Sequence, residues 1–149
     1  MAQVTATTET TLPVAPTVAL AALADYVETR PAILTEAYTD YAVESGGAGS
    51  GTVATWRLHA TSKRVRHVVA DVVVDAASVI ETDRNSSMVT TYAVVPDGAT
   101  GTRVVVTTTW DGAGGVGGFF ERTFAPRGLA RIHDGVLANL AQRLGGATA

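Results

Sequence analysis

Two side chains of this sequence combine the type and the position that acid–base chemistry requires. His67 alternates with Val65 and Val69 along a β-like segment, so we expect it to face inward with them. Imidazole titrates near neutral pH and can exchange protons with a bound molecule. Tyr92 carries an ionisable hydroxyl on another β-like segment. His67 and Tyr92 are therefore the catalytic candidates, with a structural role for a lone histidine as the alternative.

A glycine-rich segment, Gly112 to Gly117, matches the G-x-G-x-x-G pattern of dinucleotide-binding loops. In such loops the glycines bring backbone N–H groups close to a pyrophosphate at a helix N-terminus. The motif needs a second parallel strand after that helix, but the residues after Gly117 have a helical pattern to the end of the chain. We interpret the segment as a glycine hinge between a strand and a helix, and we expect no cofactor.

The composition argues against several kinds of site and partner. The 149 residues contain no cysteine and 3 histidines, which excludes Cys-ligated metals, and we expect no metal site. The net charge is −3 and the 11 Lys and Arg residues are scattered, so no nucleic-acid partner is expected. The longest apolar run, Val18 to Leu23, is far short of the ~20 residues that span a bilayer. Met1 to Thr10 lack a signal-peptide pattern, so we expect a cytoplasmic protein without membrane insertion.

Alternating β-branched and polar residues predict a first strand over residues 3–12. Later β-like segments are joined by short, turn-rich links. Such links favour antiparallel pairing, because a parallel crossover needs a dozen or more residues. Six further strands are predicted at residues 38–45, 52–61, 64–74, 78–83, 88–95 and 102–110.

Helices are predicted on both sides of this strand-rich region. An apolar face predicts a helix over residues 17–27, which the Arg30–Pro31 pair is expected to break, and a short helix or turn follows at residues 32–37. Apolar residues at three- and four-residue steps predict a C-terminal helix over residues 118–144. Pro126 should kink that helix or separate a leading piece from its main part.

These elements predict one α+β domain over residues 1–149, in which a curved antiparallel sheet must cover its apolar face. The C-terminal helix, whose apolar repeat includes His133, is the expected cover, and the two short helices would close one end. Trp56 is expected to face inward, whereas Glu81 and Asp83 share a strand face that we expect to be solvated. A bent sheet that grips a helix leaves space for an apolar ligand.

Several short segments of the sequence resemble those of a known family. Gly49 to Thr52 precede a strand that contains Trp56-Arg57-Leu58, and Thr107 to Trp110 precede the glycine segment. Gly118 to Arg122 and Phe124 to Leu129 complete the pattern. Over nearly its full length the chain resembles the polyketide cyclase/dehydrase and lipid-transport superfamily, the START-like (SRPBCC) or helix-grip proteins, and is most similar to small stand-alone members from actinobacteria.

The resemblance implies a seven-stranded antiparallel sheet wrapped around a long C-terminal helix, with a hydrophobic cavity between them. Members bind lipids, sterols, polyketides and other apolar molecules, and some cyclise or dehydrate polyketides. Aromatase/cyclase members place Arg, Tyr, Trp and His groups in the cavity, and Trp56, His67 and Tyr92 are positions that could play such parts here.

Our leading hypothesis is therefore a binder of a small hydrophobic molecule, as a monomer or homodimer. The alternatives are a polyketide cyclase or dehydratase that moves protons in the same cavity, and a protein-interaction module. The expected lining consists of Trp56, Leu58, His67, Val69, Ile80, Tyr92, Val106, Trp110, Phe119, Phe120, Ile132, Val136 and Leu140.

Overall fold

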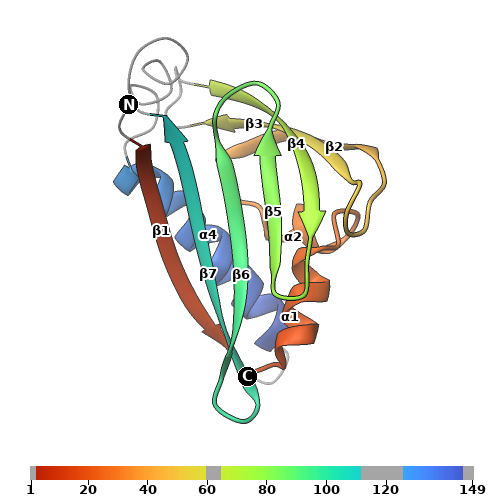
Figure 1. Ribbon diagram of the computed structural model, residues 1–149, viewed down its shortest axis with the longest axis vertical. Coiled ribbons are helices and arrows are strands. Elements are labelled where there is room, and N and C mark those ends of the chain that lie inside the picture. Colours follow the sequence, from red (N-terminus) through yellow and green to blue (C-terminus); the bar gives the residue numbers. More distant parts are fainter. Residues whose placement is uncertain (1–2, 60–64, 112–125, 146–149) are drawn as a thin grey trace.

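A curved, seven-stranded antiparallel sheet forms the body of the protein in the computed structural model, which describes residues 3–59, 65–111 and 126–145 (Figure 1). The strand order is β1-β7-β6-β5-β4-β3-β2, so β2 to β7 form a meander and β1 pairs with β7. With the C-terminal helix against it, this sheet confirms the predicted α+β architecture. The strands are β1 (Gln3–Leu12), β2 (Tyr38–Ser45), β3 (Val53–His59), β4 (Val65–Val74), β5 (Ser78–Asp83), β6 (Val89–Asp97) and β7 (Gly101–Asp111).

Side-chain alternation gives the sheet one buried face. Successive residues of a strand point to opposite sides, so residues two apart share an environment. Ala54, Trp56 and Leu58 of β3 are buried, as are Val106 and Trp110 of β7. The inward faces predicted for these two strands are confirmed.

Three helices are described: α1 (Pro16–Leu23), α2 (Thr29–Ile33) and α4 (Pro126–Gly145). In Figure 1, α4 runs behind the sheet, where it packs against β1 and α2. Pro126 is the first residue of α4, a position at which its missing N–H costs no hydrogen bond. None of the described helices is both long enough and apolar enough to cross a membrane.

The first helix is shorter than the sequence predicts, because tertiary hydrogen bonds replace its last turn. The helix ends at Leu23, and the N–H of Tyr26 donates to the carbonyl oxygen of Gly47 at 2.9 Å. The Asp25 carboxylate accepts a hydrogen bond from the Val27 N–H at 3.1 Å, a local bond that competes with helix. The prediction of a helix through Val27 is therefore wrong.

The Arg30–Pro31 pair lies inside α2, so the prediction that it breaks a helix is also wrong. Pro31 falls in the first turn of α2, where backbone N–H groups have no acceptor within the helix. Proline is tolerated there. The difference matters because α2 carries Arg30 into the interior.

A glycine-rich loop between β2 and β3 fixes the chain just after α1. Gly46 has φ = 72°, and a Cβ there would lie 2.8 Å from the Cα of Thr52. The N–H of Gly47 donates to Thr52 Oγ1 at 3.0 Å, while its carbonyl accepts the Tyr26 N–H. The loop thereby holds Tyr26 in place.

The short segment formed by α2 and the residues after it is held against α4 by close contact. A Cβ on Gly135 of α4 would lie 2.8 Å from Thr35 Cγ2, so glycine permits this approach. One turn further along α4, Asn139 Nδ2 donates to the carbonyl oxygen of Ile33 at 2.9 Å. These contacts hold α2 against α4.

Candidate ligand-binding site

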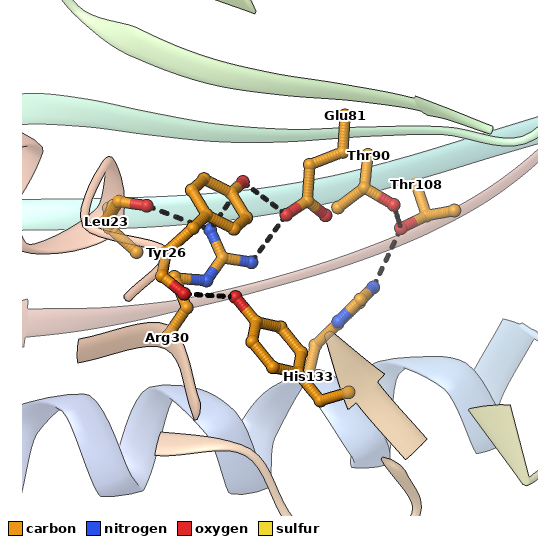
Figure 2. Close-up of polar contacts among 8 residues, drawn as sticks. Leu23, Tyr26, Arg30, Glu81, Thr90, Thr108 and His133 are labelled. Atoms are coloured by element: carbon orange, nitrogen blue, oxygen red, sulfur yellow. Dashed lines mark hydrogen bonds and ion pairs between the residues drawn. The ribbon is translucent and has the colours of Figure 1, made fainter. Parts of the chain in front are cut away.

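Arg30 is the buried charge around which the site is arranged, with 2% of its surface exposed. Its Nη1 donates to the Leu23 carbonyl oxygen and to the Tyr26 hydroxyl oxygen, each at 3.0 Å. Its Nη2 donates to Glu81 Oε2 at 2.6 Å and forms an ion pair. Figure 2 shows Arg30 lying between α4 and the sheet, directed toward Glu81.

Glu81 of β5 supplies the opposite charge from the inner face of the sheet, with 6% of its surface exposed. Its Oε2 also accepts the hydroxyl hydrogen of Tyr26 at 2.5 Å. Asp83 is buried too, and its Oδ1 accepts the N–H of Val69 at 3.0 Å. The prediction that Glu81 and Asp83 face solvent is therefore wrong: both are buried, and each carboxylate accepts hydrogen bonds from the protein.

The guanidinium of Arg30 lies over two tyrosine rings. Its central carbon lies 4.6 Å from the ring centre of Tyr26 and 4.4 Å from that of Tyr92, within the range of cation–π attraction. Burial acts to lower the pKa of Arg30, but Glu81 and the neighbouring tyrosines together outweigh it, so the pKa lies well above its usual value. Burial raises the pKa of Tyr92, so its hydroxyl stays protonated at neutral pH.

His133 of α4 is the second buried polar group, and a chain of hydroxyls connects it to the sheet. His133 Nε2 lies 2.8 Å from Thr108 Oγ1, which lies 2.8 Å from Thr90 Oγ1 (Figure 2). Burial, with the nearby Arg30 charge, lowers the pKa of His133 to about 4. The ring is therefore neutral at physiological pH.

A cavity of about 20 Å³ lies between the inner face of the sheet, α2 and α4, which is space for about one water. One side is aromatic: Tyr41 stacks on Trp56 with ring centres 6.2 Å apart, and Tyr38 meets Trp56 edge-on at 6.1 Å. The polar groups described above form the other side. The lining consists of Arg30, Leu34, Tyr38, Tyr41, Trp56, Leu58, Glu81, Met88, Thr90, Tyr92, Leu129 and His133.

Three buried nitrogen atoms of this lining have no hydrogen-bond partner among the described residues. They are Trp56 Nε1, His133 Nδ1 and Arg30 Nε. A buried polar atom without a partner costs about 1–3 kcal/mol, so such atoms are uncommon unless something else satisfies them. Within the described ranges, no group of three or more His, Asp or Glu side chains is arranged to hold a metal ion.

The structure brings some of the expected lining residues together and separates others. Trp56, Leu58 and Tyr92 line the cavity. Ile132 is partly buried and packs against the core. Val106, Trp110, Val136 and Leu140 are buried in the core outside the cavity lining.

His67 is exposed on the outer face of the sheet, so the expectation that it faces inward is wrong. The alternation of β4 runs the other way, with Val68 and Ala70 buried. Val69 and Ile80 likewise lie on the outer face, because their strand neighbours take the inward positions. Valines at successive positions of β4 gave both faces an apolar pattern, so the pattern did not identify the inner one.

Phe119, Phe120 and the glycine segment Gly112–Gly117 lie outside the described residues. Of the polar groups in the site, Arg30 was interpreted only as part of a helix break, and Tyr26 only as part of a helix. A signal for Glu81 existed, since it alternates with the apolar Val79.

The chain matches the family model described as polyketide cyclase/dehydrase and lipid transport over residues 1–145. It belongs to this family. The resemblance seen in the sequence is thus confirmed, and with it the START-like helix-grip fold. No curated protein matches the chain at a significant level.

Solved structures support the same fold. The NMR structure of a protein named KanY is 51% identical, with a TM-score of 0.88, and the match covers 97% of this chain and 99% of that one. The Zhui aromatase/cyclase from Streptomyces sp. R1128 is 12% identical, with a TM-score of 0.66 and coverage of 97% and 98%. A norcoclaurine synthase mutant from Thalictrum, in complex with a transition-state analogue, is 12% identical, with a TM-score of 0.70 and coverage of 99% and 98%.

Proposed function

We propose that this member of the family binds a small hydrophobic molecule between the curved sheet and α4. The observation that carries the proposal is the cavity, whose aromatic and aliphatic side is formed by Trp56, Tyr38, Tyr41, Leu58 and Met88. Ligand burial against such a wall contributes about 25 cal/mol per Å² of apolar surface, and a few polar groups fix the orientation. The family description, which includes lipid transport, supports the same function.

The side chains that line the cavity must move for a ligand to enter, because about 20 Å³ holds no more than about one water. Leu34, Tyr38 and Tyr41 are half-buried, whereas Arg30 and Glu81 on the polar side are buried. We place the entrance at the three half-buried residues, where α2 leads into β2. Rotation of these side chains enlarges the space without breaking the buried ion pair.

Native mass spectrometry of the protein purified from its own host tests this function. We expect a co-purified small molecule, released when the protein is denatured. A Leu58→Trp variant, which fills the cavity, should lose that molecule. Val73→Trp is the matched control, because Val73 is exposed on the outer face. A wild-type protein that carries no ligand and binds no apolar probe would contradict the proposal.

A second function, that of a polyketide cyclase or dehydratase, is favoured by one observation. The neutral His133 ring and the Glu81 carboxylate line the same cavity, and such a reaction needs one group to take a proton and another to return it. His67, being exposed, no longer fits this role, and the protonated Tyr92 fits only that of a donor.

Turnover of a synthetic poly-β-ketone, followed by mass spectrometry, separates the two functions. If the protein is an enzyme, His133→Asn should reduce turnover about a hundredfold or more while changing affinity much less. Turnover at the background rate by the wild-type protein would leave binding as the function.

A further inference from the structure

We infer that the cavity selects an uncharged molecule that carries a hydroxyl group on a ring-containing apolar body, and that it disfavours carboxylates. This inference rests on the proposed binding function and specifies the chemistry of its ligand.

Both terminal nitrogens of the Arg30 guanidinium are already committed to protein partners, whereas its Nε has none among the described residues and offers a single N–H. A carboxylate ligand would pair with both terminal nitrogens of an arginine, which is the geometry that such pairs prefer. Here Nη1 is shared between Leu23 and Tyr26, and Nη2 is held by Glu81. The guanidinium carbon also lies over the rings of Tyr26 and Tyr92, at 4.6 Å and 4.4 Å from their centres. A ligand anion therefore has to displace protein partners to pair with both terminal nitrogens at once.

The charges of the lining also disfavour an anion. Arg30 and Glu81 compensate each other, and His133 is neutral. Among the described residues, only Oε2 of Glu81 accepts hydrogen bonds, so its Oε1 is an acceptor available to a ligand donor. A carboxylate beside Glu81 would meet like charge in a poorly solvated site, whereas a hydroxyl can donate to it.

Of the three unpartnered nitrogens, Arg30 Nε is a donor that a hydroxyl or a carboxylate oxygen can satisfy, whereas the other two together favour a neutral group that can both donate and accept. Trp56 Nε1 is a donor only, so it requires an acceptor. His133 Nδ1 is either a donor or an acceptor, depending on the direction of the hydrogen bonds through Thr108 and Thr90. A hydroxyl group has the donor and the acceptor to satisfy His133 in either tautomer, and its oxygen is an acceptor suited to Trp56. A carboxylate can only accept, so it satisfies Trp56 Nε1, but it satisfies His133 Nδ1 only in the tautomer that carries a proton on that nitrogen.

The aromatic side of the cavity, opposite the polar groups, indicates the shape of the apolar part of the ligand. Trp56 is stacked by Tyr41 at an interplanar angle of 11° and met edge-on by Tyr38 at 62°. Flat and edge-on contacts of this kind are the geometries that a further aromatic ring adopts beside a cluster. A ring that enters between these side chains places its substituent toward the buried polar groups.

Matched probes test the inference on the wild-type protein. We would measure calorimetric affinities for naphthol, naphthoate and naphthalene at neutral pH, and for the smaller set of phenol, benzoate and benzene. In at least one set, the hydroxyl compound should bind about tenfold or more tightly than the carboxylate, because the carboxylate leaves its charge uncompensated. It should also bind more tightly than the bare hydrocarbon.

A variant separates the hydroxyl contact from apolar packing. Trp56→Phe keeps an aromatic ring and removes the indole N–H, so it should weaken naphthol binding about fivefold and leave naphthalene binding nearly unchanged. Trp110→Phe is the matched control, since Trp110 lies outside the cavity lining. It should change neither affinity.

The outcomes distinguish this inference from the proposed function. Carboxylates that bind as tightly as the hydroxyl compounds, or hydrocarbons that bind as tightly, would overturn the inference and leave hydrophobic binding intact. Equal losses of naphthol and naphthalene affinity in Trp56→Phe would overturn the hydroxyl contact. If no probe of either set binds, the inference falls, and the proposed function falls with it when the purified protein also carries no ligand.

Discussion

Arg30 and Glu81 are almost completely shielded from solvent, and each compensates the charge of the other. Removing one member of such a pair leaves an uncompensated charge in the interior, whereas removing both leaves none. The pair therefore contributes less to net stability than either single substitution suggests. Its main consequence is to fix α2 against β5 and to set the net charge of the cavity at zero.

Glu81→Gln should lower the free energy of unfolding by about 3–5 kcal/mol, because it leaves the buried Arg30 charge without an opposite charge. Glutamine still accepts the hydroxyl hydrogen of Tyr26. The double variant Arg30→Met/Glu81→Gln should lose less than the sum of the two single variants, measured by urea unfolding. Asp71→Asn is the control: it breaks an exposed pair with Arg84 and should cost far less. Additive single losses would contradict the account of the buried pair.

His133 makes stability depend on pH in a defined window. Its pKa is about 4 in the folded protein against an ordinary 6.5, so between these values the unfolded chain binds more protons. The free energy of unfolding should fall by up to roughly 3 kcal/mol as the pH drops through this window. The Arg30 charge opposes protonation of His133, whereas the Asp134 charge favours it.

Urea unfolding at several pH values checks this dependence. His133→Asn should flatten the slope between about pH 6.5 and 4, whereas His67→Asn, which alters an exposed ring, should not. Carboxylates with lowered pKa values, such as Asp25, act at lower pH. An NMR titration of the wild-type protein gives an independent reading. A His133 ring that titrates near its ordinary pKa would refute the prediction.

At the scale of elements, α2 completes the site, because it adds Arg30 to the cavity between the sheet and α4. It is only a few residues long and is held by contacts at both sides, to α4 through Thr35 and Asn139 and to β5 through Arg30. Gly135 matters because any side chain there would meet Thr35 before α4 reached its present position. The distance between α2 and α4 is thus set by one missing methyl group.

Gly135→Ala should destabilise the protein by about 1–3 kcal/mol through overpacking, despite the better helix propensity of alanine. Adding Thr35→Ser should restore stability, since serine lacks the clashing methyl and keeps the hydroxyl that accepts the Ala37 N–H. Gly128→Ala, with open space at the same helix, should stabilise by up to about 1 kcal/mol. Equal effects of the Gly128 and Gly135 substitutions in thermal unfolding would refute the steric explanation.

The sheet was predictable from the sequence because alternation and short turns are local signals. The strands that pair as β2 to β7 were found within a few residues of their ends, and the inward faces of β3 and β7 followed from Trp56 and Trp110. On β4 the same reasoning failed, because valine occupies both faces and offers no contrast. His133 was placed correctly on the apolar repeat of α4, but its partner Thr108 was not foreseeable.

The polar centre of the site could not be predicted, since its members meet only in the folded chain. Glu81 lies on β5 and Arg30 on α2, and their pairing depends on the sheet curvature and on the loop that anchors Tyr26. Prediction from the local sequence pattern assigns a charged residue to the solvated surface unless an oppositely charged partner is known. An acidic residue that alternates with a buried valine, as Glu81 does with Val79, is the local feature that indicates a buried carboxylate.

At the scale of the whole molecule, the site draws on four strands of the sheet, β2, β3, β5 and β6, and on helices α2 and α4. A ligand that fills this space contacts all of them at once and is lost when any of them unfolds. Binding should therefore stabilise the folded protein as a unit and not one segment of it.

Naphthol at a hundredfold excess over its dissociation constant should raise the free energy of unfolding by about 3 kcal/mol, since the unfolded chain offers no cavity. In urea titrations the midpoint should rise while the slope stays constant, because the surface exposed on unfolding is unchanged. Naphthoate at the same concentration should shift the midpoint much less. A naphthol effect that persists in Leu58→Trp, where the cavity is filled, would place the binding elsewhere on the molecule.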